Sequence, residues 1–208
     1  MDIEYFLKNL SPSSLKVIES FINNFSSTTF LDGDRQDMFR DMVVRQFISQ
    51  VMTDDERAAH LGLPSGCRVR ENVKIISPEN LICGENVWVG EGAVLDASGG
   101  LEIGSHTSIG LSVYLWSHTS YLTNLAMANQ PGSQLIERKK TKIGSGCFIA
   151  GPSAVLHGVT ISDKCVVLPM SVVTKDIPSY SMVAGNPARV IKTIDEEYIR
   201  AKIAQQMS

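Results

Sequence analysis

The chain has 208 residues and a formal net charge of −3 at pH 7, the size of one domain, or one domain with an appendage, that buries a substantial core. This charge balance argues against a dedicated nucleic-acid-binding protein, and no run of about 18 consecutive apolar residues predicts a membrane span. The acidic start "MDIEYF" lacks the features of a signal peptide, and the four cysteines show no C-x-x-C spacing. We therefore expect a cytoplasmic protein without a zinc cluster or a disulfide framework.

Residues 1–62 are predicted to form a helical N-terminal segment. Ser11 and Pro12 supply an N-cap and a first helical position before "SSLKVIESFINNF", and "RQDMFRDMVVRQFISQVM" carries its apolar residues on one stripe of a helix. Thr53 and Glu56 then form a capping-box pattern, which predicts a further short helix. The helical pattern ends at the glycine and proline that follow.

Residues 63–187 carry an internal repeat of six residues. After the "RKKTK" segment, one aliphatic residue recurs at every sixth position: Ile143, Ile149, Val155, Ile161, Val167 and Val173. The same period is present upstream, with a two-residue slip at Gly99-Gly100: Cys83, Val89, Leu95, Ile103, Ile109 and Leu115. Such a period, with turn residues between the aliphatic positions, predicts a parallel β-helix in which three units complete a triangular coil and stacked coils share an apolar interior.

This repeat, together with "VVTKDIPSYSMVAGNPARVIK" at 172–192, resembles the left-handed β-helix acyltransferases, in particular the galactoside, maltose and polysaccharide O-acetyltransferases. The resemblance covers about residues 66–192. It implies a mainly-β fold: a left-handed parallel β-helix of hexapeptide repeats over 63–187, preceded by the helical segment and followed by a C-terminal tail or short helix over 188–208. It does not extend to the N-terminal segment, so it does not identify the acceptor.

The resemblance also implies a homotrimer in which acetyl-CoA lies in the crease between neighbouring subunits, with no metal ion. The positions that match the family's cofactor residues are Ala150, Gly151, Pro169, Thr174, Lys175, Arg189 and Lys192. Small residues let the pantetheine arm approach the backbone, and cationic side chains suit the phosphates. Because proline stands at 169, where relatives carry a small residue, any contact there is made without an N–H donor.

His118 lies in "VYLWSHTS" (113–120), at the point where the upstream repeat lapses. Transfer of an acetyl group from a thioester to a hydroxyl needs a base for the hydroxyl proton, and histidine, with an ordinary pKa of ~6.5, suits that task near neutral pH. In the family the catalytic histidine emerges where the repeat gives way to a protruding loop, so the resemblance implies that His118 is the general base. His106 shares its phase but falls on a different face. His157 lies in the opposite half of the helix by sequence, and in a trimer it is a candidate for a substrate contact near a neighbour's crease.

Two further residues are expected near the acceptor. Asp96, on the turn "LDASGG", either binds sugar hydroxyls or orients His118, and Trp116 either stacks against a sugar face or packs as an ordinary aromatic. The segment 119–142 is too long for an ordinary connection, and we expect an arm that reaches over the adjacent subunit's site. Its basic run either adds charge near the nucleotide phosphates or is simply solvated: Arg138, Lys139, Lys140 and Lys142.

The predicted function is acetyl transfer from acetyl-CoA to a hydroxyl of a sugar or saccharide, by direct attack in a ternary complex. No acyl-enzyme is expected, because no serine or cysteine is placed beside a histidine as an activated nucleophile. The alternatives are N-acetylation of an amino or nucleotide sugar, a serine-type O-acetyltransferase, and a trimeric scaffold without enzymatic activity. A γ-type carbonic anhydrase, which shares the coil, is disfavoured because the sequence lacks a His-x4-His pair for its metal.

Overall fold

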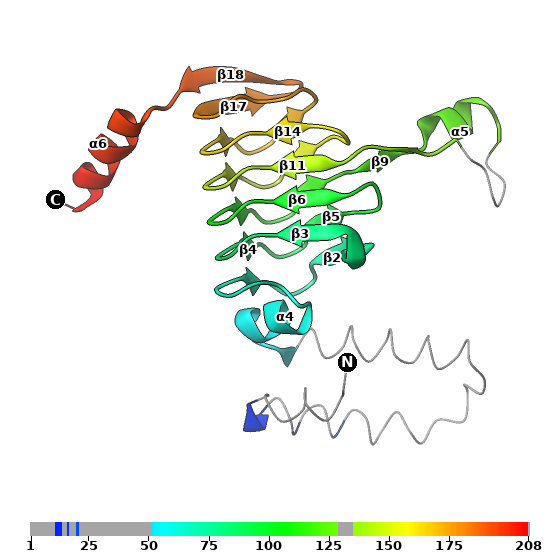
Figure 1. Ribbon diagram of the computed structural model, residues 1–208, viewed down its shortest axis with the longest axis horizontal. Coiled ribbons are helices and arrows are strands. Elements are labelled where there is room, and N and C mark those ends of the chain that lie inside the picture. Colours follow the sequence, from blue (N-terminus) through cyan, green and yellow to red (C-terminus); the bar gives the residue numbers. More distant parts are fainter. Residues whose placement is uncertain (1–10, 14–15, 17–19, 21–50, 129–134, 208) are drawn as a thin grey trace.

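The computed structural model describes residues 11–13, 16, 20, 51–128 and 135–207, and its body is a parallel β-helix whose coils stack between α4 and β18 (Figure 1). The predicted mainly-β fold is confirmed. Most of the helical segment predicted over 1–62 lies outside the described residues. The short helix predicted after Thr53 is present as α4 (Asp54–His60).

Three parallel sheets form the three faces of the coil. The first face contains β1 (Arg68–Val69), β4 (Trp88–Val89), β7 (Ser108–Ile109), β12 (Phe148–Ile149), β15 (Val166–Val167), β17 (Ser181–Gly185) and, antiparallel at its end, β18 (Ala188–Thr193). The second contains β2 (Lys74–Ile76), β5 (Val94–Asp96), β8 (Tyr114–Leu115), β13 (Ala154–Val155) and β16 (Val172–Val173). The third contains β3 (Leu81–Cys83), β6 (Leu101–Ile103), β11 (Thr141–Ile143) and β14 (Thr160–Ile161).

The hexad residues form the apolar interior that the repeat predicted. The six downstream members are all 0% exposed: Ile143, Ile149, Val155, Ile161, Val167 and Val173. Each fully buried Val or Ile side chain contributes about 1.5–3 kcal/mol relative to an exposed one, so the stability of the β-helix is distributed along the whole stack.

The number of residues per coil changes along the chain. Downstream, Ile149 pairs with Val167, 18 residues later, which is three hexads. Upstream, Val89 pairs with Ile109, so a coil there has 20 residues. The two additional residues in the second coil are the predicted glycine pair. In the first coil they are accommodated by a 3-10 helix that the sequence did not predict, η1 (Pro78–Asn80).

An arm, described over residues 118–128 and 135–138, leaves the β-helix after the second face and projects sideways from it (Figure 1). It begins with β9 (His118–Thr119), continues into α5 (Tyr121–Leu125) and returns as β10 (Glu137–Arg138), which pairs antiparallel with β9. The hydroxyl of Thr123 donates to the carbonyl of Leu135 at 2.9 Å and ties α5 to the returning strand. The chain rejoins the β-helix at β11, so the arm ends slightly before the predicted boundary at residue 142.

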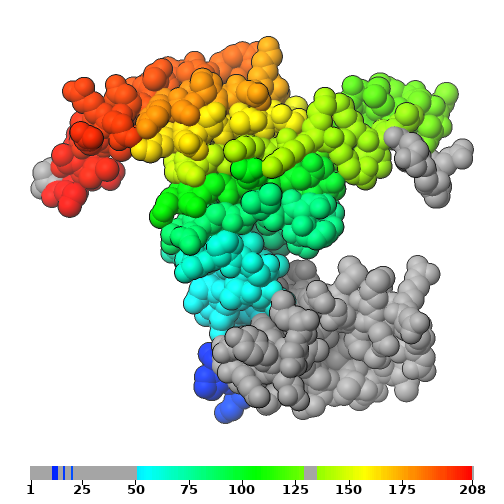
Figure 2. All heavy atoms as spheres, viewed as in Figure 1, coloured from blue at the N-terminus to red at the C-terminus, as the bar shows by residue number. Residues whose placement is uncertain are grey.

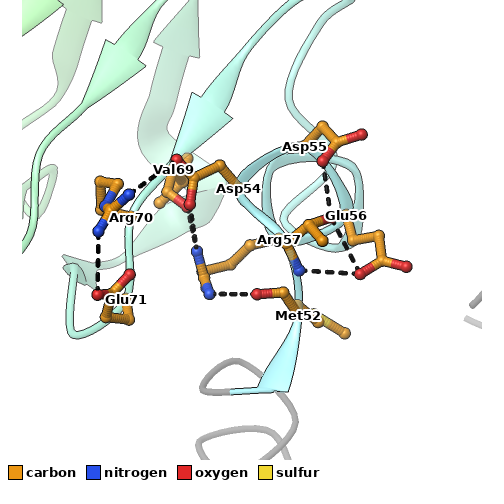
Figure 3. Close-up of polar contacts among 9 residues, drawn as sticks. Met52, Asp54, Asp55, Glu56, Arg57, Val69, Arg70 and Glu71 are labelled. Atoms are coloured by element: carbon orange, nitrogen blue, oxygen red, sulfur yellow. Dashed lines mark hydrogen bonds and ion pairs between the residues drawn. The ribbon is translucent and has the colours of Figure 1, made fainter. Parts of the chain in front are cut away.

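The N-terminal end of the β-helix is covered by α4, through a buried arginine (Figure 3). Arg57 is only 3% exposed; its Nη2 donates to the carbonyl of Met52 at 2.6 Å, and its Nη1 donates to the carbonyl of Val69 on β1. The predicted capping box is present, since the N–H of Thr53 donates to a carboxylate oxygen of Glu56 at 2.9 Å. The guanidinium therefore satisfies the carbonyl of Val69 in the first coil, which has no preceding coil to pair with, and the carbonyl of Met52 just before α4.

Beyond residue 187, where the β-helix is predicted to end, β18 adds an antiparallel strand to the first face and reaches Thr193. The predicted C-terminal helix is α6 (Glu196–Met207), which has no buried residue; Figure 2 shows it projecting from the side opposite the arm. The hydroxyl of Tyr180 donates to Glu196 at 2.9 Å and anchors the start of this helix. Among the described helices, none has the length and apolar character needed to cross a membrane.

Candidate active site

The second face ends at a corner where side chains from successive coils meet. Strands β5 and β8 pair in register, with Leu95 opposite Leu115. Asp96, the residue after Leu95, therefore lies one coil before Trp116, and the chain turns outward into the arm at His118. The β-helix thus brings together an acid and a base that are 22 positions apart in the sequence.

Asp96 and His118 form a close pair at this corner. Nδ1 of His118 lies 2.6 Å from Oδ2 of Asp96, and the same oxygen accepts the backbone N–H groups of Ser117 at 2.9 Å and His118 at 3.1 Å. Oδ1 accepts the N–H of Ser98 at 3.0 Å, and Ser98 Oγ lies 3.0 Å from Nδ1. Because an ionised carboxylate only accepts hydrogen bonds, Nδ1 carries the proton in the neutral imidazole and Nε2 keeps its lone pair.

The environment of Asp96 keeps its carboxylate ionised. Burial alone would raise its pKa, since the residue is 0% exposed, but the hydrogen bonds from Ser117, Ser98 and His118 outweigh that effect and lower the pKa to about 2. The imidazole is 29% exposed, so one side of the pair is sealed and the other is open. An imidazolium that forms on His118 is therefore stabilised by a fixed negative charge.

The glycine pair at the repeat's slip is part of this corner. A Cβ on Gly99 would lie 2.1 Å from the carbonyl oxygen of Ser117 and 2.9 Å from the N–H nitrogen of Lys139, so no side chain fits there. Its own N–H donates to Ser117 Oγ at 2.8 Å, and Gly100 adopts φ +93°. The slip that interrupts the hexad count is therefore the turn that packs the Asp96 loop against the root of the arm.

Two aromatic side chains accompany His118. Tyr114, Trp116 and His118 occupy alternate positions, so their side chains point the same way, outward from the coil. The rings of Tyr114 and Trp116 are stacked with centroids 6.1 Å apart, and the Trp116 ring meets the imidazole edge-on at 6.3 Å. Trp116 is half-buried and Tyr114 is 39% exposed. Tyr114 and Ser98 were not among the residues predicted for the site. Tyr114 stands four residues before His118 and Ser98 two residues after Asp96, and these spacings could have identified them.

His157 lies at the same corner as His118, one coil later, and not in the opposite half of the helix. Strands β8 and β13 pair with Leu115 opposite Val155, so the arm between them is not part of the stack. The residues that follow β13 therefore lie over those that follow β8. Nε2 of His157 lies 3.5 Å from a carboxylate oxygen of Glu137 at the root of the arm. The expected place of His157 in the opposite half of the helix was wrong, because the arm adds no coil between the two histidines. A contact of His157 with a neighbour's crease stays a prediction. His106 lies in the turn after β6, at a different corner, as predicted.

The predicted cofactor residues lie at two different corners and on β18. Thr174 and Lys175 follow β16, at the corner that holds His118. Ala150 and Gly151 follow β12, and Pro169 follows β15, at the other edge of the second face. A Cβ on residue 151 would lie 1.6 Å from the carbonyl oxygen of the coil below, so the glycine there is required by packing as well as available for a ligand.

The remaining two cofactor candidates, Arg189 and Lys192, are exposed on β18. The guanidinium of Arg189 donates to the neighbouring carbonyl of Ala188 at 2.8 Å, and Nζ of Lys192 lies 3.8 Å from the ring centroid of Tyr198. One copy of the chain therefore distributes these residues over opposite edges of a face. In the described residues no group of three His, Cys, Asp or Glu side chains is arranged to hold a metal ion.

Comparisons with known proteins give the following likenesses. No family model matches the chain. The chain is 35% identical over 124 residues to the putative colanic acid biosynthesis acetyltransferase WcaF of Escherichia coli (strain K12), covering 60% of this chain and 64% of that protein. It is 34% identical over 109 residues to serine acetyltransferase 2 of Arabidopsis thaliana, covering 52% and 31%. The chain thus spans less than two thirds of the length of these curated relatives.

Solved structures share the fold. A maltose O-acetyltransferase from Clostridium difficile 630 superposes with a TM-score of 0.59 at 25% identity, over 73% of this chain and 83% of that one. A galactoside acetyltransferase in complex with coenzyme A superposes with a TM-score of 0.59 at 22% identity, over 82% and 86%, and at this identity the likeness concerns the fold alone.

Proposed function

We propose that this chain, which is a relative of the hexapeptide-repeat acetyltransferases, transfers an acetyl group from acetyl-CoA to a hydroxyl group of a saccharide. The observation that carries the proposal is the Asp96–His118 pair, a buried ionised carboxylate 2.6 Å from an open imidazole at the point where the β-helix gives way to the arm. The names of the relatives support the donor and the reaction class, since they include O-acetyltransferases and a complex with coenzyme A. Because the donor is an intracellular metabolite, we place the reaction in the cytoplasm.

The mechanism follows from the protonation of this pair. Nε2 of His118 accepts the proton of the acceptor hydroxyl as that oxygen attacks the thioester carbonyl. The imidazolium that forms is stabilised by Asp96 through Nδ1, and a backbone N–H in the crease stabilises the oxyanion. Collapse of the tetrahedral intermediate breaks the carbon–sulfur bond, and the proton on Nε2 passes to the leaving thiolate. The proton that leaves the hydroxyl is the one that the thiolate receives, so the reaction yields the ester and the free thiol without net uptake of a proton.

No covalent acetyl-enzyme is needed. The hydroxyl of Ser98 lies 3.0 Å from Nδ1 of His118 rather than beside Nε2, so His118 is not placed to activate it. In the described residues, Cys67, Cys147 and Cys165 are buried, and burial together with the neighbouring Cys67 thiol raises the pKa of Cys83 to about 12. Direct transfer in a ternary complex is therefore the route that this site supports.

We further propose that three subunits assemble side by side and that acetyl-CoA lies between two of them. The division of the predicted cofactor residues between the two edges of the second face supports this assembly, because a crease between subunits would bring opposite edges together. The exposed cations Lys175, Arg189 and Lys192 suit the phosphates of the donor. Light scattering should report a mass of three copies of the 22.7 kDa chain, and a monomer at micromolar concentration would contradict a shared site.

Other acceptors are separate arms of the same test. The likeness to a serine acetyltransferase makes the hydroxyl of serine one acceptor to include, and an amino sugar tests N-acetylation. Asp96 is an unsuitable ligand for any of them, because it is 0% exposed and both its oxygens already accept hydrogen bonds. Of its two predicted roles, the geometry supports orientation of His118, whereas Trp116 is open enough to contact an acceptor.

The experiment that tests the function measures acetyl-CoA binding by calorimetry and thiol release with sugars, nucleotide sugars, amino sugars and serine. The parent is compared with His118→Ala and with the matched control His106→Ala, which removes an exposed imidazole at another corner. We expect all three proteins to bind acetyl-CoA and only His118→Ala to lose turnover. Absence of acetyl-CoA binding by the parent would contradict the transferase and leave the non-enzymatic scaffold.

A further inference from the structure

Three of the four cations in the basic run at the end of the arm are paired within the chain. Lys139 Nζ lies 2.6 Å from a carboxylate oxygen of Glu137. Lys140 and Lys142 lie 2.6 Å and 2.8 Å from the two carboxylate oxygens of Glu102 on β6. The contacts with Glu102 hold the end of the arm to the third face, and the Lys139 contact lies within the returning strand's own segment. The three lysines therefore have a structural explanation that involves no ligand.

The fourth cation, Arg138, is different. It is exposed, and its guanidinium has no hydrogen-bond or ion-pair partner in the part of the chain that the structure describes. The carboxylates nearest along the chain and across the hairpin are already engaged: Glu137 contacts Lys139 and His157, and Asp96 is sealed behind His118. An exposed guanidinium without an internal partner is available to a ligand.

Strand pairing places Arg138 directly beside the proposed base. In the β9–β10 hairpin Arg138 is the cross-strand partner of His118. The N–H of Lys139 donates to the carbonyl of Ser117 at 2.9 Å, and the N–H of His118 donates to Asp96 rather than across the hairpin. His118 and Arg138 are therefore a non-hydrogen-bonded pair of the ladder. Side chains of such a pair project from the same side of the ribbon, with Cβ atoms about 4.5–5.5 Å apart.

We propose that Arg138 determines acceptor specificity by binding an oxyanion of the acceptor, either a carboxylate of an acidic sugar or a phosphate of a sugar phosphate. This inference rests on the proposed acetyl transfer and names the class of saccharide that it uses. The planar guanidinium presents paired N–H donors that match both oxyanions, whereas the ammonium groups of the neighbouring lysines are point charges. The charged substituent lies within an arginine's length of the hydroxyl that His118 deprotonates.

The position of the guanidinium separates this role from binding of the donor. Of the predicted phosphate-binding cations, Arg189 and Lys192 are on β18, at the C-terminal end of the stack, and the arm leaves the β-helix several coils earlier (Figure 1). The third, Lys175, follows β16 at the corner that holds His118, but two coils later than β8. Arg138 is instead tied by its strand register to the base itself. Its ligand is therefore the molecule whose hydroxyl reacts.

The test compares matched neutral and anionic acceptors: 4-nitrophenyl β-D-glucoside with the glucuronide, and glucose with glucose 6-phosphate. Thiol release is measured for the parent, Arg138→Ala, Arg138→Lys and the control Lys140→Ala. The control removes one positive charge two residues after Arg138, just beyond the end of β10. We expect Arg138→Ala to reduce kcat/KM for the anionic member by roughly 10- to 100-fold, mainly through KM, as loss of a charge-assisted hydrogen bond predicts. Rates with the neutral member should be unchanged, and Arg138→Lys should be intermediate.

Several results would overturn the inference. Equal losses with neutral and anionic acceptors would make Arg138 a part of the chemistry or the fold, and a rise in the KM of acetyl-CoA alone would assign it to the donor. Equal effects of Lys140→Ala would show a general field rather than a contact. Turnover of the neutral acceptors alone by the parent would refute the anionic class while leaving the proposed function intact. Absence of thiol release with every acceptor would overturn the proposed function and this inference together.

Discussion

Replacement of Asp96 by asparagine tests the central feature of the site. The substitution keeps the shape of the side chain but removes its charge, and it places an amide N–H₂ group among donors: Oδ2 accepts three N–H groups, from Ser117, from the backbone of His118 and from Nδ1. In either orientation of the new amide, its N–H₂ group therefore faces at least one N–H that the carboxylate accepted. The pKa of Asp96 falls from 3.8 to about 2 in the folded chain, so at 1.36 kcal/mol per pKa unit the carboxylate contributes about 2 kcal/mol to stability at neutral pH.

The effect of Asp96→Asn on turnover follows from the imidazolium. A hydrogen bond to a charged group contributes about 1.5–3 kcal/mol, and this contribution grows as His118 takes the proton in the transition state. We therefore expect kcat to fall by roughly 10- to 100-fold, with little change in the KM of the acceptor. Because Asp96 acts through His118, Asp96→Asn should cost almost nothing further in a His118→Ala background.

Two measurements check this reasoning. Thiol release under saturating acetyl-CoA gives kcat for the single and double variants, and ¹⁵N NMR of the imidazole reports its tautomer without any acceptor. The parent should carry its proton on Nδ1, and Asp96→Asn should show a mixture of tautomers. Multiplicative losses in the double variant, a rise in acceptor KM at constant kcat, or an unchanged tautomer would show that Asp96 does not act by orienting His118.

Further predictions concern stability. The pKa of Asp96 is lowered in the folded chain, so its contribution of about 2 kcal/mol to stability is fully present above pH ~4 and is lost as the pH falls toward 2. The free energy of unfolding of the parent, measured in urea, should therefore decrease over this pH range. The corresponding decrease should be absent from Asp96→Asn. Gly99→Ala would place a Cβ 2.1 Å from a carbonyl oxygen. It should destabilise the fold by more than the ~1 kcal/mol expected for Gly62→Ala, where φ is positive but no atom lies within 4 Å of the new Cβ. Equal urea midpoints for the two variants would contradict the close packing at Gly99. Arg57→Met should leave two buried carbonyls unsatisfied and lower the free energy of unfolding by about 2–5 kcal/mol. Arg70 is half-exposed, so Arg70→Met should lower it by under about 1 kcal/mol. Similar losses of stability for both variants would refute the capping role of Arg57.

The sequence by itself determined the β-helix and its interior. A β-helix repeats a local unit, so the residue that points inward recurs at a constant interval, and that interval can be counted without knowledge of long-range contacts. Ile143 and the hexad positions after it were predicted as core and are 0% exposed. The slip at Gly99-Gly100 and the protruding arm after His118 could likewise be recognised, since each is an interruption of a regular count.

The contents of the site were decided by the tertiary structure. The pairing of Asp96 with His118 depends on a coil of 20 residues, in which the glycine turn returns the chain to the right register. The approach of Arg138 to His118 depends on how the arm's two strands align. His157 reaches the same corner only because the arm is excluded from the stack. Each of these contacts runs between coils or across a hairpin, where hydrogen-bond register sets the partner and inserted residues change the sequence separation. A period along the chain shows which way a side chain points, but lateral register decides which side chain it meets.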